Sequence, residues 1–256
     1  MPTSLACQVG NTAPLCLIRA DLLEFSRMIT SSMDYRHSPE EVQSLGLLKE
    51  LQKALSDAIN SLDDQAPPPA TVDCQYLQTA ATSVNRAADG YLLLREAYRV
   101  DSSKLLVRPA LEAVFAASAV MKKPGFLTRK AISEWEEEQM MFKHQDAAAQ
   151  AAARQEFEDF KVNFIRDNPN YPADWRPVCV RKTAEDAQME HIYNTTYRTY
   201  CKFTHGALGA VHGGLNEATN SKDTSIVNCC VMIMLGLLKQ YTPAHVPNLE
   251  SFRKRM

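Results

Sequence analysis

Apolar residues recur at helical spacing along most of this chain. Between residues 15 and 29 they stand three or four positions apart, and similar patterns continue to residue 241. This spacing places the side chains on one face of an α-helix, whereas a strand would alternate every second residue. The chain has only 9 glycines and 8% aromatic residues, a composition that favours helix over sheet. The sequence therefore predicts an all-α fold, a bundle of about seven helices.

A proline-rich stretch divides the helical pattern. Three successive prolines, Pro67 to Pro69, remove backbone hydrogen-bond donors and force extended geometry. We therefore expect residues 64–72 to link an N-terminal helical hairpin, residues 1–63, to a main helical bundle, residues 73–256.

Local signals set several helix boundaries. Residues 38–41, Ser-Pro-Glu-Glu, form a capping box with proline at the first helical position. Pro109 is expected to kink a helix over 103–121 or to mark its true start. A long polar helix over 128–164 is expected to project in part, and Asp223 to cap the last helix. The other expected helices span 15–35, 39–62, 73–98, 183–212 and 224–241.

Charge, cysteine usage and hydropathy narrow the setting of the chain. The net charge of -2 gives no overall attraction to nucleic acid, so an RNA contact would need a local basic patch such as Arg181-Lys182. The 7 cysteines include no Cys-x-x-Cys pair and follow no regular spacing, which is typical of reduced thiols. The most apolar run, residues 226–238, is too short to span a bilayer and indicates a buried core helix. With no secretory signal in the sequence, we expect a cytoplasmic protein that does not enter a membrane.

An arginine and two histidines define the first candidate site. Arg198, His205 and His212 follow one another at intervals of seven, about two helical turns, so all three would share one helix face. His212 stands just before two glycines and resembles a helix-end residue more than a catalytic group.

A second row of residues runs beside this one. Tyr193, Tyr197, Cys201 and His205 step by four, and Lys202 lies one turn after Arg198. These polar and reactive groups indicate a binding or catalytic surface. They are equally consistent with ordinary core-edge residues that each make one hydrogen bond to a neighbouring helix.

An upstream helix carries a polar pair among apolar neighbours. Arg108 and Glu112 stand four positions apart, and buried charges need partners. The pair could be an internal salt bridge. Alternatively, Glu112 could orient His205, or Arg108 could join Arg198 in an anion-binding pocket, because guanidinium groups suit phosphate.

Other chemistries have weaker support in the sequence. Glu112, His205 and His212 could offer three metal ligands, but the spacings typical of metal sites are absent. Cys201 as a nucleophile lacks a surrounding motif. The chain also lacks the glycine-rich loops that bind nucleotide phosphates, so we predict neither a metal nor another cofactor.

Two patterns resemble a known family. The segment 105–113, LLVRPALEA, and the downstream Trp175 with the Tyr-Tyr-Cys-His row resemble DUF5677, a bacterial family of all-helical proteins of unknown function. In that family an Arg-x-x-x-Glu helix precedes a tyrosine-rich helix that ends in Ser-x-x-x-His. Here Cys201 stands where serine is usual, and the resemblance covers residues 77–241. The family name implies no activity.

Arg198 and His205 are also similar to the Arg-x(4–6)-His signature of the HEPN superfamily of helical ribonucleases and nucleotide-binding modules. That resemblance implies that His205 acts as general acid/base and that Arg198 stabilises charge on the scissile phosphate. The 2′-hydroxyl of the RNA would then attack the neighbouring phosphate and cleave the RNA strand without a metal. It also implies a homodimer. In this sequence Thr199 follows the arginine, where asparagine or aspartate is more usual.

Two hypotheses about function follow. The first is a metal-independent ribonuclease or nucleotide-processing protein of bacterial defence or toxin–antitoxin systems, with RNA or a nucleotide as its partner. Arg198 and His205 would be central to it. The second is a non-enzymatic helical module that binds a small anionic ligand, or that binds a protein partner through the helix over 128–164. In the first hypothesis, Arg108 and Glu112 would join Arg198 and His205 as catalytic residues, and the substrate would be bound by Tyr193, Tyr197, Cys201 and Lys202.

Overall fold

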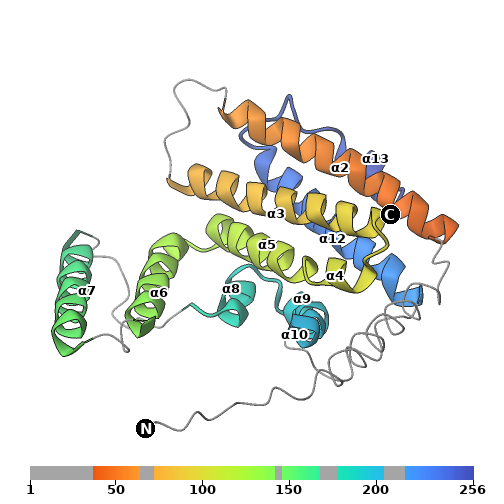
Figure 1. Cartoon of the computed structure of the whole chain (residues 1–256). Helices are drawn as coiled ribbons and strands as arrows, with labels where there is room; N and C mark the ends of the chain where they lie inside the picture. The colour runs from red at the N-terminus through yellow and green to blue at the C-terminus, as the bar shows by residue number, and fades with distance from the viewer. Residues whose placement is uncertain (1–36, 64–71, 142–145, 168–177, 205–216) are drawn as a thin grey trace, which may run out of the picture. The chain divides into compact units, whose positions relative to one another are not determined.

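The computed structural model describes residues 37–63, 72–141, 146–167, 178–204 and 217–256 (Figure 1). Every secondary-structure element in these ranges is helical, which confirms the all-α prediction. Nearly all of the described residues belong to one compact unit, Pro39–Met256.

Four long helices form the core of this unit: α2 (Pro39–Asp63), α3 (Val72–Glu96), α5 (Val107–Lys122) and α12 (Glu217–Leu238). Helix α12 packs against the other three, and α3 packs against both α2 and α5 (Figure 1). Burying a leucine or valine side chain contributes about 1.5–3 kcal/mol, so this shared apolar interior dominates the stability. The run over 226–238 is a buried core helix as predicted, and its fully buried members include Val231, Met234, Leu235 and Leu238.

The first core helix, α2, begins at Pro39, as its proline predicted. It packs on α3 and α12 and so belongs to the same compact unit as they do. The helix expected over 15–35 and most of the linker over 64–72 lie outside the described residues. The predicted hairpin over 1–63 therefore stays a prediction.

The helix expected over 103–121 is two helices, α4 (Val100–Lys104) and α5. Pro109 stands in the first turn of α5, so it marks the true start of that helix and does not kink it. Backbone N–H groups in a first turn have no partner within the helix, so proline removes nothing there.

The prediction of a single long helix over 128–164 is wrong. The structure has two helices there, α6 (Phe126–Met141) and α7 (Ala147–Asp167), and α7 packs against α6 (Figure 1). Asp146 precedes α7, and its Oδ1 accepts hydrogen bonds from the backbone N–H groups of Ala148 and Ala149 at 3.0 and 2.9 Å. This aspartate satisfies two N–H groups of the first turn, which fixes a new helix start.

The helix expected over 183–212 is also broken. Helix α8 (Val180–Asp186) ends before Gln188, whose φ of 58° is left-handed. The chain then turns into α9 (Glu190–Ile192), a π-helical turn η2 (Tyr193–Tyr197) and α10 (Arg198–Thr204). Residues 205–216 lie outside the described residues, so the expected end near residue 212 is not tested.

The last core helix, α12, starts earlier than predicted. It begins at Glu217, so Asp223 lies within it and is not its cap. Asp223 is buried, and its side chain meets charged and polar partners from other helices. After α12 comes a short unpredicted helix, α13 (Leu249–Arg253), where the side chain of Asn248 accepts the backbone N–H of Glu250 at 3.1 Å.

A buried ion pair joins α2 to α3. The guanidinium of Arg95 contacts the carboxylate of Glu41, and their side chains are 0% and 4% exposed. The Arg95 guanidinium also lies 5.8 Å from the centre of the Tyr91 ring. Removing both charges from water is costly, so the pair stabilises the fold only while both partners are present.

Replacing Glu41 with alanine should therefore strand the Arg95 charge in the core and lower the free energy of unfolding by about 3–5 kcal/mol. A matched control joins the same two helices at the surface, where the Lys49–Glu96 pair has side chains 58% and 52% exposed. Breaking that pair with Lys49→Ala should change stability by about 0–1 kcal/mol. Urea unfolding of both variants measures the difference, and equal losses would contradict this role of the buried pair.

Candidate functional site

Three of the sequence-predicted site residues meet where η2 lies on α5. The Tyr197 hydroxyl donates to Oε1 of Glu112 at 2.6 Å. Nε of Arg108 donates to the same oxygen at 2.8 Å and to the Tyr197 hydroxyl at 3.2 Å. We call this triangle of Arg108, Glu112 and Tyr197 the polar cluster.

Aromatic rings support the polar cluster. The ring of Tyr197 stacks on that of Tyr193, with centroids 5.1 Å apart and planes 19° apart, and meets the edge of Phe115 at 6.0 Å. The Arg108 guanidinium lies 5.7 Å from the centre of the Tyr197 ring. Tyr197 is 4% exposed, whereas Tyr193 and Cys201 are half-buried. The buried tyrosine thus anchors the turn, and its neighbours line the edge of the cluster.

The electrostatics of the polar cluster fix its protonation. Burial raises the pKa of Tyr197, and the hydrogen bond to Glu112 and the negative charge there raise it further. A hydrogen bond with the Cys201 side chain acts in the same direction. The hydrogen bond to Glu112 also raises the pKa of Arg108. At neutral pH the tyrosine is therefore a neutral donor and the arginine is charged.

The polar cluster keeps hydrogen-bonding groups available. Arg108 uses only Nε within it, and Nη1 and Nη2 form no hydrogen bond with the described residues. Glu112 likewise uses only Oε1. The two side chains are 27% and 35% exposed. The cluster can therefore offer an incoming ligand two guanidinium nitrogens and one carboxylate oxygen.

The solvent face of α10 carries two of the predicted cations. Arg198 and Lys202 are exposed and stand one turn apart. Neither forms an ion pair with a described residue, so both charges are available to a ligand. His205 and His212 lie outside the described residues, so the proposed meeting of His205 with Glu112 stays a prediction. Within the described ranges, no group of three or more His, Cys, Asp or Glu side chains could hold a metal ion.

A second polar group, buried between α4, α10 and α12, was not predicted. The Tyr200 hydroxyl donates to Oδ1 of Asp223, and Nζ of Lys104 lies 4.0 Å from Oδ2. Lys104, 1% exposed, also lies 3.7 Å from the Asp101 carboxylate. Burial raises the pKa of Asp223, although the Tyr200 hydrogen bond and the Lys104 charge oppose that shift. The lysine stands beside the apolar run that starts at Leu105, and that was the only signal in the sequence for its burial.

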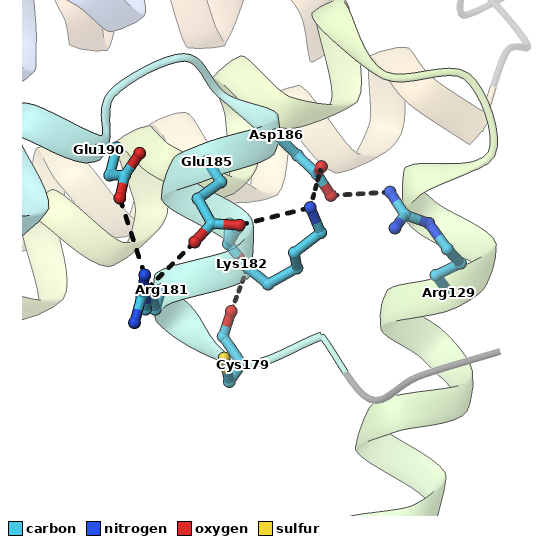
Figure 2. A network of polar contacts seen from close by, with 8 residues as sticks. Arg129, Cys179, Arg181, Lys182, Glu185, Asp186 and Glu190 are labelled. Atoms are coloured by element: carbon cyan, nitrogen blue, oxygen red, sulfur yellow. Dashed lines mark hydrogen bonds and ion pairs between the residues drawn. The ribbon is translucent and has the colours of Figure 1, made fainter. Parts of the chain in front are cut away.

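The basic dipeptide Arg181-Lys182 is neutralised by carboxylates (Figure 2). Lys182 lies 3.3 Å from Asp186 and 3.4 Å from Glu185, and Arg181 lies 3.1 Å from Glu185. Arg129 of α6 reaches across to Asp186 at 2.8 Å, and so ties α6 to α8. This patch is therefore an ion-pair network that joins helices and leaves little charge for a nucleic acid.

The fold and the polar cluster together define an all-helical protein with a charged and aromatic group between α5 and η2. The family model of DUF5677, a family of unknown function, matches residues 76–222, more than half of the chain. The chain belongs to this family, which confirms the predicted resemblance to DUF5677.

No curated protein and no solved structure matches the chain. The similarity to HEPN ribonucleases therefore stays a prediction. None of the helices in the described part of the chain has the length and hydropathy needed to cross a membrane.

Three tyrosines with raised pKa values predict how the stability of the fold depends on pH. Burial raises the pKa of Tyr76 to about 12, and burial with a nearby carboxylate raises those of Tyr197 and Tyr200 above their ordinary 10.0. Above pH 10 the unfolded chain loses these protons while the folded chain keeps them. The contribution of these tyrosines to the free energy of unfolding should therefore be complete below pH 10 and should be lost as pH rises further.

Urea unfolding at a series of alkaline pH values measures this fall. Tyr200→Phe should make the decline shallower, because it removes a group whose pKa is raised in the folded chain. Tyr98→Phe, at an exposed position, is the control substitution. Equal slopes in both variants and the parent would contradict a shifted Tyr200.

Proposed function

We propose that the chain binds a phosphate-bearing ligand, a nucleotide or RNA, over the polar cluster and the exposed face of α10. The observation that carries the proposal is the geometry of Arg108. Its Nε is held by Glu112 and Tyr197 while its two terminal nitrogens are not committed to described residues. A guanidinium fork of this kind matches the oxygens of a phosphate.

Preorganisation favours this use of Arg108. A free arginine side chain loses rotamer entropy when a ligand fixes it, about 0.5–1.5 kcal/mol for each side chain immobilised. Here the Glu112 hydrogen bond and the contact with the Tyr197 ring already hold the guanidinium in place. A ligand would therefore meet a donor group that is already oriented.

Binding of a phosphate would also need the positive charges of the two cations on α10. Arg108 and Glu112 carry opposite charges, so the polar cluster alone is neutral. Arg198 and Lys202 add positive charge on the adjoining helix, and both are exposed. Since the whole chain has a net charge of -2, attraction to phosphates would come from this local group and would weaken as salt rises.

The backbone at this position also supports a functional role. Tyr193–Tyr197 form a π-helical turn. Such turns are rare and occur frequently at functional sites, where the inserted residue redirects side chains.

A second step, metal-free RNA cleavage, is supported by Arg198, which is exposed and forms no ion pair with the described residues. In this proposal Arg198 stabilises charge on the scissile phosphate and His205 acts as general acid/base. A homodimer, a cytoplasmic location and a role in bacterial defence or toxin–antitoxin systems belong to the same proposal. Binding without cleavage would leave the non-enzymatic anion-binding module. The protein-partner alternative has lost its original ground, because the helix that suggested it is two helices.

Binding should show directly in the fluorescence anisotropy of a labelled single-stranded RNA. Arg108→Ala should weaken binding about 10- to 100-fold, because it removes charge-assisted hydrogen bonds. Arg198→Ala should weaken it and lower the salt slope by about 0.7, the value for one single-strand phosphate. The control is Arg253→Ala, because that side chain is 75% exposed on α13. If RNA binding were absent, or Arg108→Ala were equal to the control, the proposal would fail.

Cleavage is tested by incubating the purified protein with RNA in the presence of EDTA. The parent protein should cut the RNA, and His205→Ala and Arg198→Ala should each stop the cutting while leaving the circular dichroism unchanged. Intact RNA at a large excess of the parent protein would rule out the nuclease and leave binding alone.

A further inference from the structure

We propose that the polar cluster selects single-stranded RNA through one nucleobase that carries an exocyclic amino group. The base would stack on Tyr193, and its amino group would donate an N–H hydrogen bond to Oε2 of Glu112. The inference rests on the proposed function, to which it adds the class of base that the site accepts.

Tyr193 has the properties of a stacking platform. One face of its ring lies on the ring of Tyr197, at 5.1 Å between centroids, and Tyr197 is itself 4% exposed and packed against Phe115. The face of the Tyr193 ring that lies on Tyr197 is therefore supported by core residues. Tyr193 is half-buried, and its hydroxyl forms no hydrogen bond with the described residues. Bases of single-stranded RNA stack on supported aromatic rings of this kind.

Glu112 supplies the discrimination between bases. Arg108 and Tyr197 both donate to its Oε1, so that oxygen is committed, whereas Oε2 has no partner among the described residues. The side chain is 35% exposed, so Oε2 can be reached from solvent. A carboxylate oxygen accepts a hydrogen bond from the amino group of cytosine or adenine. The O4 carbonyl of uracil is an acceptor at the same position and would be repelled.

The cations place the backbone of the RNA beside this base. Arg198 follows Tyr197 directly in the chain, and the uncommitted nitrogens of Arg108 belong to the cluster that includes Glu112. A nucleotide with its base on Tyr193 could then rest its phosphate on these guanidinium groups. One site would thus combine stacking, a hydrogen bond to the base and phosphate contacts, and of these the hydrogen bond carries the preference for one base over another.

The test compares three probes in one binding assay: a short cytidine oligonucleotide, the matching uridine oligonucleotide and inorganic polyphosphate. The parent protein should bind the cytidine probe about 5-fold or more tightly than the uridine probe. Tyr193→Leu, which keeps apolar packing but not the aromatic face, should weaken cytidine binding about 5- to 150-fold and leave polyphosphate binding unchanged. Tyr98→Leu, at the exposed Tyr98, is the matched control and should change neither.

Glu112→Gln gives a second readout that is independent of stacking. It presents an amide group in place of Oε2, so the preference for cytidine over uridine should shrink or reverse. Equal cytidine and uridine binding by the parent, or unchanged cytidine binding in Tyr193→Leu, would overturn base selection while polyphosphate binding still supported the phosphate site. Loss of binding to all three probes by the parent would instead overturn the proposed function itself.

Discussion

Two tyrosine hydroxyls hold the segment from Tyr193 to Thr204 on the bundle. Tyr197 donates to Glu112 on α5, and Tyr200 donates to Asp223 on α12. Helix α10 has only 7 residues, and a helix of that length is not stable without tertiary contacts. The position of Tyr193, Arg198 and Lys202 therefore depends on these two hydrogen bonds, which stand three residues apart and face two different core helices.

A few buried polar groups also connect the helices of the core. Apolar burial between α2, α3, α5 and α12 provides most of the stability, but it is not directional. Arg95 with Glu41 joins α3 to α2, and Lys104 lies close to Asp223 across α4 and α12. Replacing both members of such a pair with apolar side chains would change the stability of the fold little. Removing one member would lower the stability strongly, because the other charge would stay buried without a partner. We infer that these pairs fix which helix faces meet, and that the polar cluster is placed as a consequence.

Much of this arrangement could be predicted from the sequence. Helical spacing predicted the all-α fold, and charges in an apolar setting singled out Arg108 and Glu112. The four-residue spacing placed Tyr193 and Tyr197 on one helix face, and their rings do stack, although on a π turn and not on a regular helix. That Tyr197 bonds to Arg108 and Glu112 was not predicted.

The failures have physical causes. Gln188 adopts a left-handed φ without the glycine that usually indicates it, so the break before α9 left no signal. Asp146 lies inside the range expected as one helix, 128–164, but its carboxylate accepts first-turn N–H groups of α7 and so starts a new helix, which apolar spacing alone does not reveal. Asp223 stands directly before the helix expected over 224–241, which made it a candidate cap, but α12 begins earlier and Asp223 is buried against Lys104 and Tyr200, which are distant in sequence. Long-range partners of this kind cannot be inferred from local spacing.

The most direct test of the ligand site is an NMR titration of the protein, isotopically labelled at its tyrosine rings, with cytidine monophosphate. If the polar cluster is the ligand site, the ring signals of Tyr193 and Tyr197 should shift in a saturable manner. The signals of Tyr91, which is fully buried in the core, should stay in place. Saturable shifts confined to other tyrosines, or no shift at any nucleotide concentration, would contradict the assignment of the site.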